Sequence, residues 1–245
     1  MTGGNHRLTL SARPFVGRTG RGVRIAVVDS GIALQHPHVG AVVSGICLIC
    51  EGDAIADYRD RHGHGTAVAA AIREKAPKAD LMAVRVFERT LSTTAETLAQ
   101  AIRWAADHGA RLINLSLGTP NENRRVLLSD AVAHAMAQGA LVVAAAESEG
   151  HAMLPGVLPG TVGVGLGVAC EREELIVEHD AAGTLRLAAS GYPRPIPGVP
   201  PERNVSGISF AVANVTGFLA RLLEEAQPVT SIDALAKLLR PESDA

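Results

Sequence analysis

The stretch VRIAVV at residues 23–28 decides the fold, because it is a short run in which nearly every residue on both faces is apolar. Such a run predicts a strand that is covered by helices on each side, as in a parallel sheet. Similar strand-like runs follow at 42–49, 81–87, 111–117, 140–146 and 161–166. The sequence therefore predicts a sheet whose two faces are both buried.

Helical patterns lie between these runs. Thr93 and Glu96 stand at capping-box spacing before a helix that Gly109 ends, and a second helix is predicted at about 126–138. Two more helices are expected to begin near His64 and Ser209, and a terminal one at 231–240. This alternation predicts an α/β fold of three layers, α/β/α, around a mostly parallel, doubly wound sheet. Five prolines at 191–201 predict an irregular surface loop.

Composition narrows the class of protein. The chain has 245 residues, of which 47% are hydrophobic, and this favours one domain over residues 1–245, with a core at about 22–225 and a C-terminal helix and tail at 226–245. A net charge of -2 gives no electrostatic reason to expect nucleic acid as a partner. No apolar run reaches the length of roughly 18 residues that a membrane span needs, so no membrane partner is expected.

The three cysteines, Cys47, Cys50 and Cys170, cannot all pair. Cys47 and Cys50 lie in the strand-like run 42–49 and its end, where residues three apart point to opposite faces. We therefore expect buried free thiols rather than a redox or zinc site. With no signal-like apolar run at residues 1–20, this predicts a cytoplasmic protein, provided that no leader has been removed. No metal or cofactor is expected.

Three residues are candidates for nucleophilic chemistry. Asp29 follows the strand 23–28, at the end where functional groups collect in α/β sheets, although an aspartate there is commonly a turn residue. His64 lies between two glycines at the start of a helix, which leaves the ring accessible as a base; a loop histidine is the alternative. Ser209 precedes an apolar helix, where a serine is usually an N-cap but where its own N–H can also face an oxyanion.

The segments around these residues resemble the three signature blocks of the subtilase family, in the order Asp, His, Ser. They are VVDSGI at 27–32, HGHGT at 62–66 and SGISFA at 206–211. INLSLG at 113–118 is similar to the substrate-binding strand of that family, and 142–146 and 154–156 resemble the run into its oxyanion loop and the rim of its first pocket. The resemblance implies a subtilisin-like fold with a catalytic triad of Asp29, His64 and Ser209. It also implies substrate-binding residues, which are Ser116, Leu117, Gly118, Pro155 and Gly156.

The sequence departs from the family pattern around the oxyanion hole. Ser148 stands where the family has an asparagine whose amide donates into the hole, and Glu147 precedes it. The resemblance thus gives a hole made by Ser148 and the N–H of Ser209, in which the serine hydroxyl reaches less far than an amide. Ile208 replaces a threonine, and Ala213-Asn214 replaces Pro-His. We expect these changes to leave the triad complete and to alter stabilisation of the oxyanion. Loss of the proline is also expected to make the start of the helix more regular and to shift Ser209 slightly, which matters for nucleophilic chemistry.

Three functions fit these observations. The leading one is a serine endopeptidase that cuts a peptide or precursor protein, as in maturation of a ribosomally made peptide. The second is a pseudo-protease that binds peptides, because the hole is altered. The third is an acyl transferase or peptide ligase, in which an amine resolves the acyl-enzyme. The substrate's identity and the oligomeric state stay open.

Overall fold

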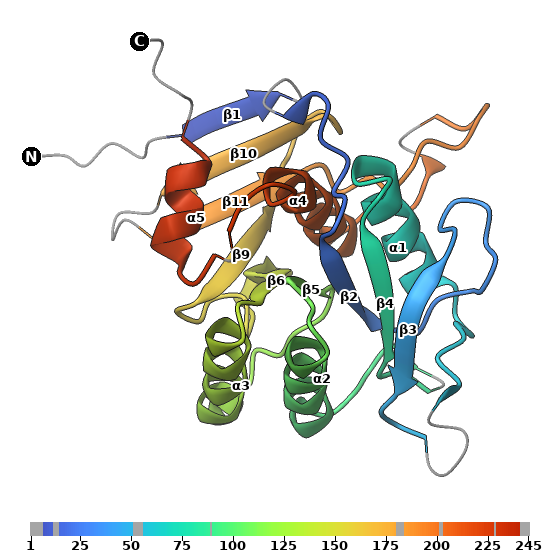
Figure 1. Cartoon of the computed structure of the whole chain (residues 1–245), viewed down its shortest axis with the longest axis vertical. Helices are drawn as coiled ribbons and strands as arrows, with labels where there is room; N and C mark the ends of the chain where they lie inside the picture. Colours follow the sequence, from blue (N-terminus) through green and yellow to red (C-terminus); the bar gives the residue numbers. More distant parts are fainter. Residues whose placement is uncertain are drawn as a thin grey trace, which may run out of the picture.

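A computed structural model describes residues 7–11, 15–50, 56–88, 90–179, 184–200, 203–227 and 229–240. Nine strands of this part of the chain form one sheet (Figure 1), in the order β1-β10-β11-β9-β6-β5-β2-β4-β3. These strands are β1 (Arg7–Ser11), β2 (Arg24–Asp29), β3 (Val42–Cys47), β4 (Asp80–Arg85), β5 (Leu112–Leu115), β6 (Leu141–Ala145), β9 (Thr161–Leu166), β10 (Glu174–His179) and β11 (Leu185–Ala189). A separate hairpin joins β7 (Glu147–Ser148) to β8 (His151–Ala152).

The sheet is mostly parallel, as the apolar runs predict. From β11 to β3 every neighbouring pair of strands is parallel, and β10 pairs antiparallel with both β11 and β1. Within this sheet β2 lies between β5 and β4, third from the end that β3 forms. The carboxyl ends of these parallel strands meet at one edge, which is where an open α/β sheet places its functional groups.

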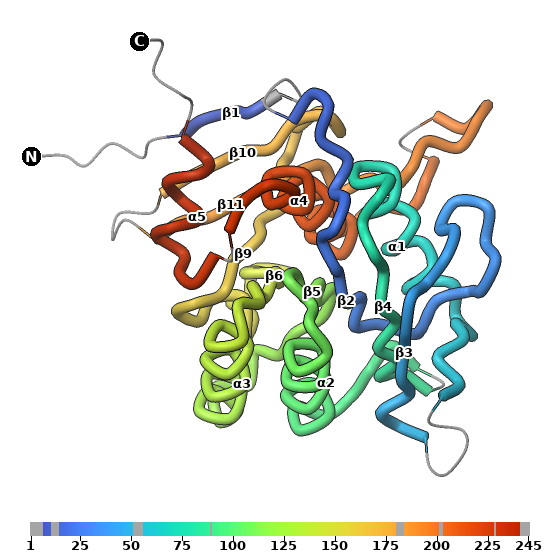
Figure 2. The backbone as a smooth tube through the Cα atoms, viewed as in Figure 1, coloured from blue at the N-terminus to red at the C-terminus, as the bar shows by residue number. Residues whose placement is uncertain are grey.

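Helices cover both faces of the sheet, which confirms the three-layer α/β/α architecture. On one face α1 (His64–Lys75), α4 (Ile208–Leu222) and α5 (Ile232–Leu238) share a core with Ile25 and Val27 of β2. On the other face α2 (Ala95–Asp107) and α3 (Arg125–Ala137) pack with Ala26 and Val28 of the same strand. In Figure 2 α2 and α3 run side by side below the sheet, and α4 lies above it. Strand β2 is thus buried on both sides.

Most predicted elements agree with the structure to within about two residues. Helix α2 begins one residue later than the capping-box spacing predicts, because the Thr94 hydroxyl, not that of Thr93, accepts the bond from the N–H of Thr97. Residues 191–200 contain neither helix nor strand, as predicted, and Pro201 lies outside the described residues. No described helix is both long and apolar enough to cross a bilayer.

The sheet also contains strands that the sequence analysis missed. Strand β1 pairs with β10 along its whole length, from Arg7 opposite Glu178 to Ser11 opposite Glu174. It therefore adds a strand to the sheet ahead of the expected start of the core near residue 22. Strands β10 and β11 complete this antiparallel corner: in β11 buried and partly exposed residues alternate, whereas β10 is buried at Leu175, Ile176 and Val177 and partly exposed at its ends.

The prediction of free thiols at positions 47 and 50 is wrong. Cys47 and Cys50 form a disulfide, with their Cα atoms 5.4 Å apart. The argument from opposite strand faces fails because β3 ends at Cys47, so that Cys50 lies in the turn that follows and folds back toward it. Cys170 is free and buried, as expected. The cytoplasmic location stays a prediction.

Candidate active site

Asp29 is the last residue of β2 and is completely buried. Its carboxylate accepts hydrogen bonds from Nδ1 of His64, at 2.8 Å to Oδ1 and 2.9 Å to Oδ2. The backbone N–H of Ser30 also donates to Oδ1, at 2.7 Å. These donors compensate the carboxylate for the loss of water. The structure therefore joins two of the three predicted catalytic residues.

His64 is the first residue of α1, and the glycines beside it let the helix begin close to β2. Gly63 is the N-cap residue, with φ 88, a left-handed conformation that suits glycine. At Gly65 a Cβ atom would lie only 2.2 Å from the carbonyl oxygen of Gly31 and 3.1 Å from Cβ of Asp29. Only a glycine at 65 lets the imidazole reach the carboxylate with this backbone geometry.

The protonated form of His64 is stabilised in the folded protein. Its hydrogen bond to Asp29 raises the pKa of the imidazole, burial opposes this effect, and the charges of Asp29 and Asp60 add to the increase. A buried carboxylate that holds Nδ1–H leaves Nε2 as the free nitrogen of the neutral ring. His64 can therefore accept a proton at Nε2 and keep it as an ion pair with Asp29.

Asp60 is a further residue of the site that the sequence analysis did not identify. Its Oδ1 accepts the Ser30 hydroxyl at 2.9 Å and the N–H groups of His62 and Gly63 at 2.8 Å. Its Oδ2 accepts the N–H of Thr66 at 2.9 Å and the Thr66 hydroxyl at 2.5 Å. Burial opposes ionisation of Asp60, but these hydrogen bonds outweigh it and lower its pKa. Asp60 thus fixes the segment on both sides of His64.

Ser209 lies in the first turn of α4, directly after Ile208 and the N-cap residue Gly207. Its hydroxyl donates to the carbonyl oxygen of Ser116 at 3.3 Å, and the Ser116 hydroxyl donates to the Ser209 carbonyl at the same distance. Between described residues, no hydrogen bond joins Ser209 to His64. The ring of the next residue, Phe210, lies 6.1 Å from the His64 ring, centre to centre. The hydroxyl of Ser209 is thus turned to Ser116, and its neighbour Phe210 contacts the histidine.

Helix α4 runs unbroken through the positions where the family has Pro-His. Ala213 is fully buried, and the amide of Asn214 donates to the carbonyls of Ser190 and Tyr192 at 2.9 and 3.0 Å. With no proline to crowd the preceding turn, the helix begins regularly at Ile208. The first-turn N–H of Ser209 has no acceptor within the helix, which leaves it available to an incoming oxygen.

Ser148 lies in the short β7–β8 hairpin, paired with His151. The turn uses Glu149 and Gly150, both with positive φ, of 51 and 77. The Ser148 hydroxyl makes no hydrogen bond to the rest of the described chain, and Glu147 is exposed. The segment that follows strand β6 is therefore a compact hairpin whose free hydroxyl is available as a donor.

The predicted substrate-binding residues lie along two adjoining segments. Ser116, Leu117 and Gly118 follow β5 and are partly exposed, and Thr119 pairs with Leu154 through two backbone hydrogen bonds of 2.9 Å. Pro155 and Gly156 come directly after and are buried. A Cβ at 156 would lie 1.8 Å from the carbonyl oxygen of Ala145, so glycine is required there. A hollow of about 200 Å³ adjoins Leu117 and Gly118, with Phe87 and Leu91 in its wall.

Titratable side chains elsewhere do not gather into a metal site. Among the described residues no group of three or more His, Cys, Asp or Glu side chains lies close enough to hold a metal ion.

Comparison with known proteins gives a consistent result. The sequence profile of the family described as "Subtilase family" matches residues 20–241. Thermitase of Thermoactinomyces vulgaris is 37% identical over 140 residues, which cover 54% of this chain and 50% of thermitase. Subtilisin Savinase of Lederbergia lenta is 36% identical over 143 residues, which cover 55% of this chain and 51% of that protein. The chain therefore spans about half the length of these curated relatives.

Solved structures share the fold over most of the chain. Sphericase superposes with a TM-score of 0.67 at 28% identity, covering 90% of this chain and 83% of sphericase. A protein described as a lanthipeptide protease superposes with a TM-score of 0.65 at 20% identity, covering 87% of this chain and 76% of that chain. At the lower identity the likeness concerns the fold alone.

Proposed function

The chain belongs to the subtilase family, and we propose that it is a serine endopeptidase in which Ser209 attacks, His64 acts as the base and Asp29 orients it. The observation that carries the proposal is the buried Asp29 carboxylate at 2.8 Å from Nδ1 of His64. A carboxylate in this position selects the tautomer in which Nε2 accepts a proton, and it stabilises the imidazolium that forms.

The reaction we propose begins when the Ser209 hydroxyl leaves the carbonyl of Ser116 and turns to Nε2 of His64. Its oxygen then attacks the scissile carbonyl while His64 takes the proton, and the imidazolium returns that proton to the leaving amine. The acyl group on Ser209 is released by water, which His64 activates in the same way. The 3.3 Å bond to Ser116 is long enough to break at little cost.

The oxyanion in this proposal is held by the N–H of Ser209 and by the hydroxyl of Ser148. Ser209 is placed in the first turn of α4, where N–H groups have no acceptor within the helix. Ser148 carries a hydroxyl without a partner among the described residues. A hydroxyl is a weaker match for this task than a longer amide, so we expect turnover below that of a complete hole.

The substrate we propose is an extended peptide or precursor protein that pairs with residues 116–118 as an added strand. Support comes from the part-exposed backbone there and from the adjoining hollow beside Leu117 and Gly118. Maturation of a ribosomally made peptide is a fitting task, since a structural neighbour at 20% identity is described as a lanthipeptide protease.

A peptide-binding protein without turnover is the second candidate. The observation that favours it is the Ser209 hydroxyl, which bonds to Ser116 and not to His64. Acyl transfer to an amine is the third, because Ala213 and the altered hole change how an acyl-enzyme is resolved.

One experiment separates these candidates. A fluorophosphonate probe should label the native full chain and should fail to label Ser209→Ala, which controls for adventitious labelling. If the probe does not label the native protein, both enzymatic candidates are refuted and the peptide-binding protein is the candidate that is left. Products from a peptide library, incubated with and without an added amine, then distinguish the enzymes by mass spectrometry: free carboxylates mean hydrolysis, and mainly amide products mean transfer.

A further inference from the structure

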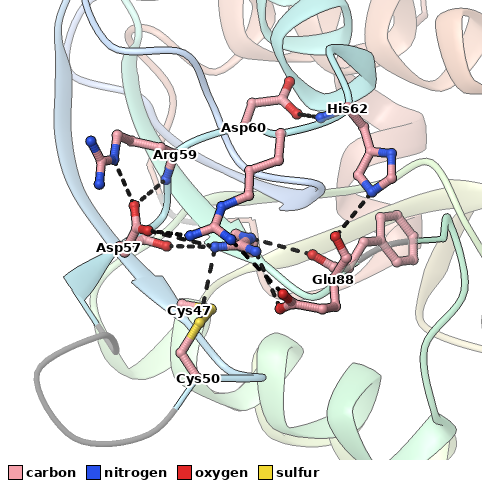
Figure 3. A network of polar contacts seen from close by, with 10 residues as sticks. Cys47, Cys50, Asp57, Arg59, Asp60, His62 and Glu88 are labelled. Carbon is pink, nitrogen blue, oxygen red and sulfur yellow. Dashed lines mark hydrogen bonds and ion pairs between the residues drawn. A yellow bond between two sulfur atoms is a disulfide. The ribbon is translucent and has the colours of Figure 1, made fainter.

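The disulfide between Cys47 and Cys50 lies beside a buried cation. Nη1 of Arg85 is 4.0 Å from Sγ of Cys50, and the Arg85 side chain is only 1% exposed. Figure 3 shows Cys50, Asp57 and Glu88 in one network of polar contacts. Arg85 also donates to the carbonyl of Asp57 at 3.1 Å and to Oε2 of Glu88 at 3.3 Å. The cluster closes the carboxyl ends of β3 and β4, at the same edge of the sheet as Asp29.

This disulfide contributes little to stability by the usual route. The stabilisation that a cross-link gives by restricting the unfolded chain grows with the number of residues in the closed loop. Here the two cysteines are separated by 3 positions, so the loop is very short. Restriction of the unfolded chain therefore does not explain why these two cysteines are paired.

The two sulfur atoms differ in their surroundings. Cys47 is completely buried at the end of β3, whereas Cys50 lies in the following turn and is partly exposed. An attacking thiolate therefore reaches Cys50 first. A guanidinium beside a cysteine favours its thiolate form, and Arg85 lies beside Cys50.

The charged side chain that the structure places against Cys50 is that of Arg85. The guanidinium groups of Arg59, Arg61 and Arg85 face the two carboxylates of Asp57 and Glu88. Hydrogen bonds from Arg59 and Arg61 lower the pKa of Asp57, so that its carboxyl is ionised. Glu51 and Asp53 follow Cys50 in the sequence and lie outside the described residues. In the described part of the chain, the charge that Cys50 meets is thus the guanidinium of Arg85.

We infer that Cys47 and Cys50 form a thiol–disulfide exchange site whose co-reactant is a dithiol. One thiolate of the dithiol attacks Sγ of Cys50 and breaks the bond to Cys47, which leaves as a thiolate and takes up a proton. The second thiolate of the dithiol then attacks the mixed disulfide, and Cys50 leaves as a thiolate beside Arg85. The protein disulfide gains two electrons, and the dithiol loses two electrons and two protons.

The exchange has a consequence for the active site, and this consequence rests on the proposed function. Arg85 holds Asp57, and Nε2 of His62 contacts the carbonyl of Glu88 at 3.1 Å. A Cys50 thiolate competes with Asp57 for Arg85 and loosens the segment that leads to His64. We therefore expect the reduced protein to cleave peptides several-fold more slowly than the oxidised one.

The first test exposes the native full chain to buffers with different ratios of reduced and oxidised dithiothreitol. After an acid quench and alkylation, mass spectrometry counts the reduced Cys47 and Cys50, while buried Cys170 is an internal control that stays reduced. We expect reduction to follow the buffer ratio while the circular dichroism of the folded protein is unchanged. A disulfide that opens only when the chain unfolds would overturn the exchange site.

The second test compares two single variants. Cys47→Ser leaves Cys50 as a free thiol, and Cys50→Ser leaves Cys47; the alkylation rate by iodoacetamide is followed against pH. We expect Cys50 to react at least tenfold faster than Cys47 at pH 7, with an apparent pKa below the ordinary value of about 8.5. Equal rates, or an ordinary pKa for Cys50, would refute the role of Arg85.

Two further variants, each made in the Cys47→Ser protein, are expected to shift the apparent pKa of Cys50 in opposite directions. Arg85→Gln should raise the apparent pKa of Cys50, whereas Glu88→Gln, at a side chain that is 53% exposed, should lower it. Glu88→Gln keeps the test decisive if the buried Arg85 variant does not fold. Alkylation measures the reactivity of the thiols without any peptide substrate. A native protein that cleaves no peptide would therefore refute the proposed function, while the alkylation results would still test the exchange site.

Discussion

The two sides of the proposed active site are built in opposite ways. On the side of the base, Asp29 and His64 are fixed by the hydrogen bonds of Asp60 and by a glycine, Gly65, that lets a helix touch a strand. On the side of the oxyanion, Ser148 lies in a two-residue strand beside an exposed turn. The base side tolerates almost no movement, while the oxyanion side is a short hairpin with an exposed turn.

The difference shows which part of the proposed site depends most on exact placement. A base must be held to within a fraction of an ångström, because a misplacement of 1 Å costs about 10²-fold in rate. An oxyanion donor on a hairpin can be exchanged without disturbing the sheet. We therefore expect substitutions on the base side to cost far more than substitutions in the hairpin.

The largest expected effect is that of Asp29→Asn. The amide cannot hold the imidazole in the productive tautomer, so kcat should fall by about 10⁴-fold. Steady-state hydrolysis of a fluorogenic peptide that the native protein cleaves measures this loss, and circular dichroism verifies the fold. A loss of kcat smaller than that caused by Ser148→Ala would show that the oxyanion side is more sensitive to substitution than the base side.

A smaller effect is expected for Gly65→Ala. The added methyl group would lie 2.2 Å from the carbonyl of Gly31, which forces α1 away from β2. We expect a loss of about 10²-fold in kcat/KM and a destabilisation of about 1–3 kcal/mol in urea unfolding.

Gly63→Ala is the matched control for that variant. Gly63 has a positive φ, of 88, but nothing lies within 4 Å of the position that an added methyl group would take. The substitution should cost only the conformational strain of about 1–2 kcal/mol. Equal losses of activity at both positions would show that close contact with β2 is not what places His64.

The pH profile tests the electrostatics of the base side. Because the pKa of His64 is raised, the imidazolium persists above the ordinary histidine value of about 6.5, and activity should rise as pH passes the raised value. The Asp29–His64 pair also stabilises the fold fully below about pH 6.5, and this contribution is lost as pH rises through the folded pKa. Melting temperatures across this range measure the loss.

Asp60→Asn should shift that activity profile to lower pH, because it removes a carboxylate that stabilises the imidazolium. It should also lower the activity plateau by about tenfold, since the segment around His64 is held less firmly. Profiles of kcat/KM against pH for both proteins give the two effects separately. A lower plateau with an unmoved profile would limit Asp60 to a structural role.

The smallest effect is expected in the hairpin. Ser148→Ala should lower kcat by about tenfold or less, well below the 10²–10³-fold cost of a lost oxyanion donor, a figure that was measured on subtilisin itself. Ser148→Asn should raise kcat, because an amide reaches further. If neither variant changes kcat, the second donor is another group.

Long apolar runs made the centre of the fold predictable. The run at 23–28 is buried on both faces of the sheet, so one apolar run in the sequence indicates both its burial and its strand structure. Strand β1 was missed because it is partly exposed and alternates over only 5 residues, which resembles many surface segments. Strand β10 was missed because its buried apolar run is confined to Leu175, Ile176 and Val177.

The sequence identified the candidate residues that stand in characteristic blocks of side chains. It did not identify a residue that belongs to the site only through its position in the fold. Asp29, His64 and Ser209 stand in recognisable blocks of sequence, whereas Asp60 acts through backbone N–H groups that no pattern of side chains reveals. Its position four residues before His64, beside a turn, was the available signal. The disulfide was missed because the sequence does not state that β3 ends at Cys47.

Helix α4 gives the molecule a property that concerns its synthesis. Ser209 stands at the start of this helix, which is buried along most of its length between α1 and the sheet, and its partner Ser116 lies 93 residues earlier. A ribosome-bound chain has made Asp29 and His64 long before it has made the proposed nucleophile and the helix that positions it. Under the proposed function, the emerging protein is therefore unable to cut itself or its neighbours until residues 208–222 have been translated.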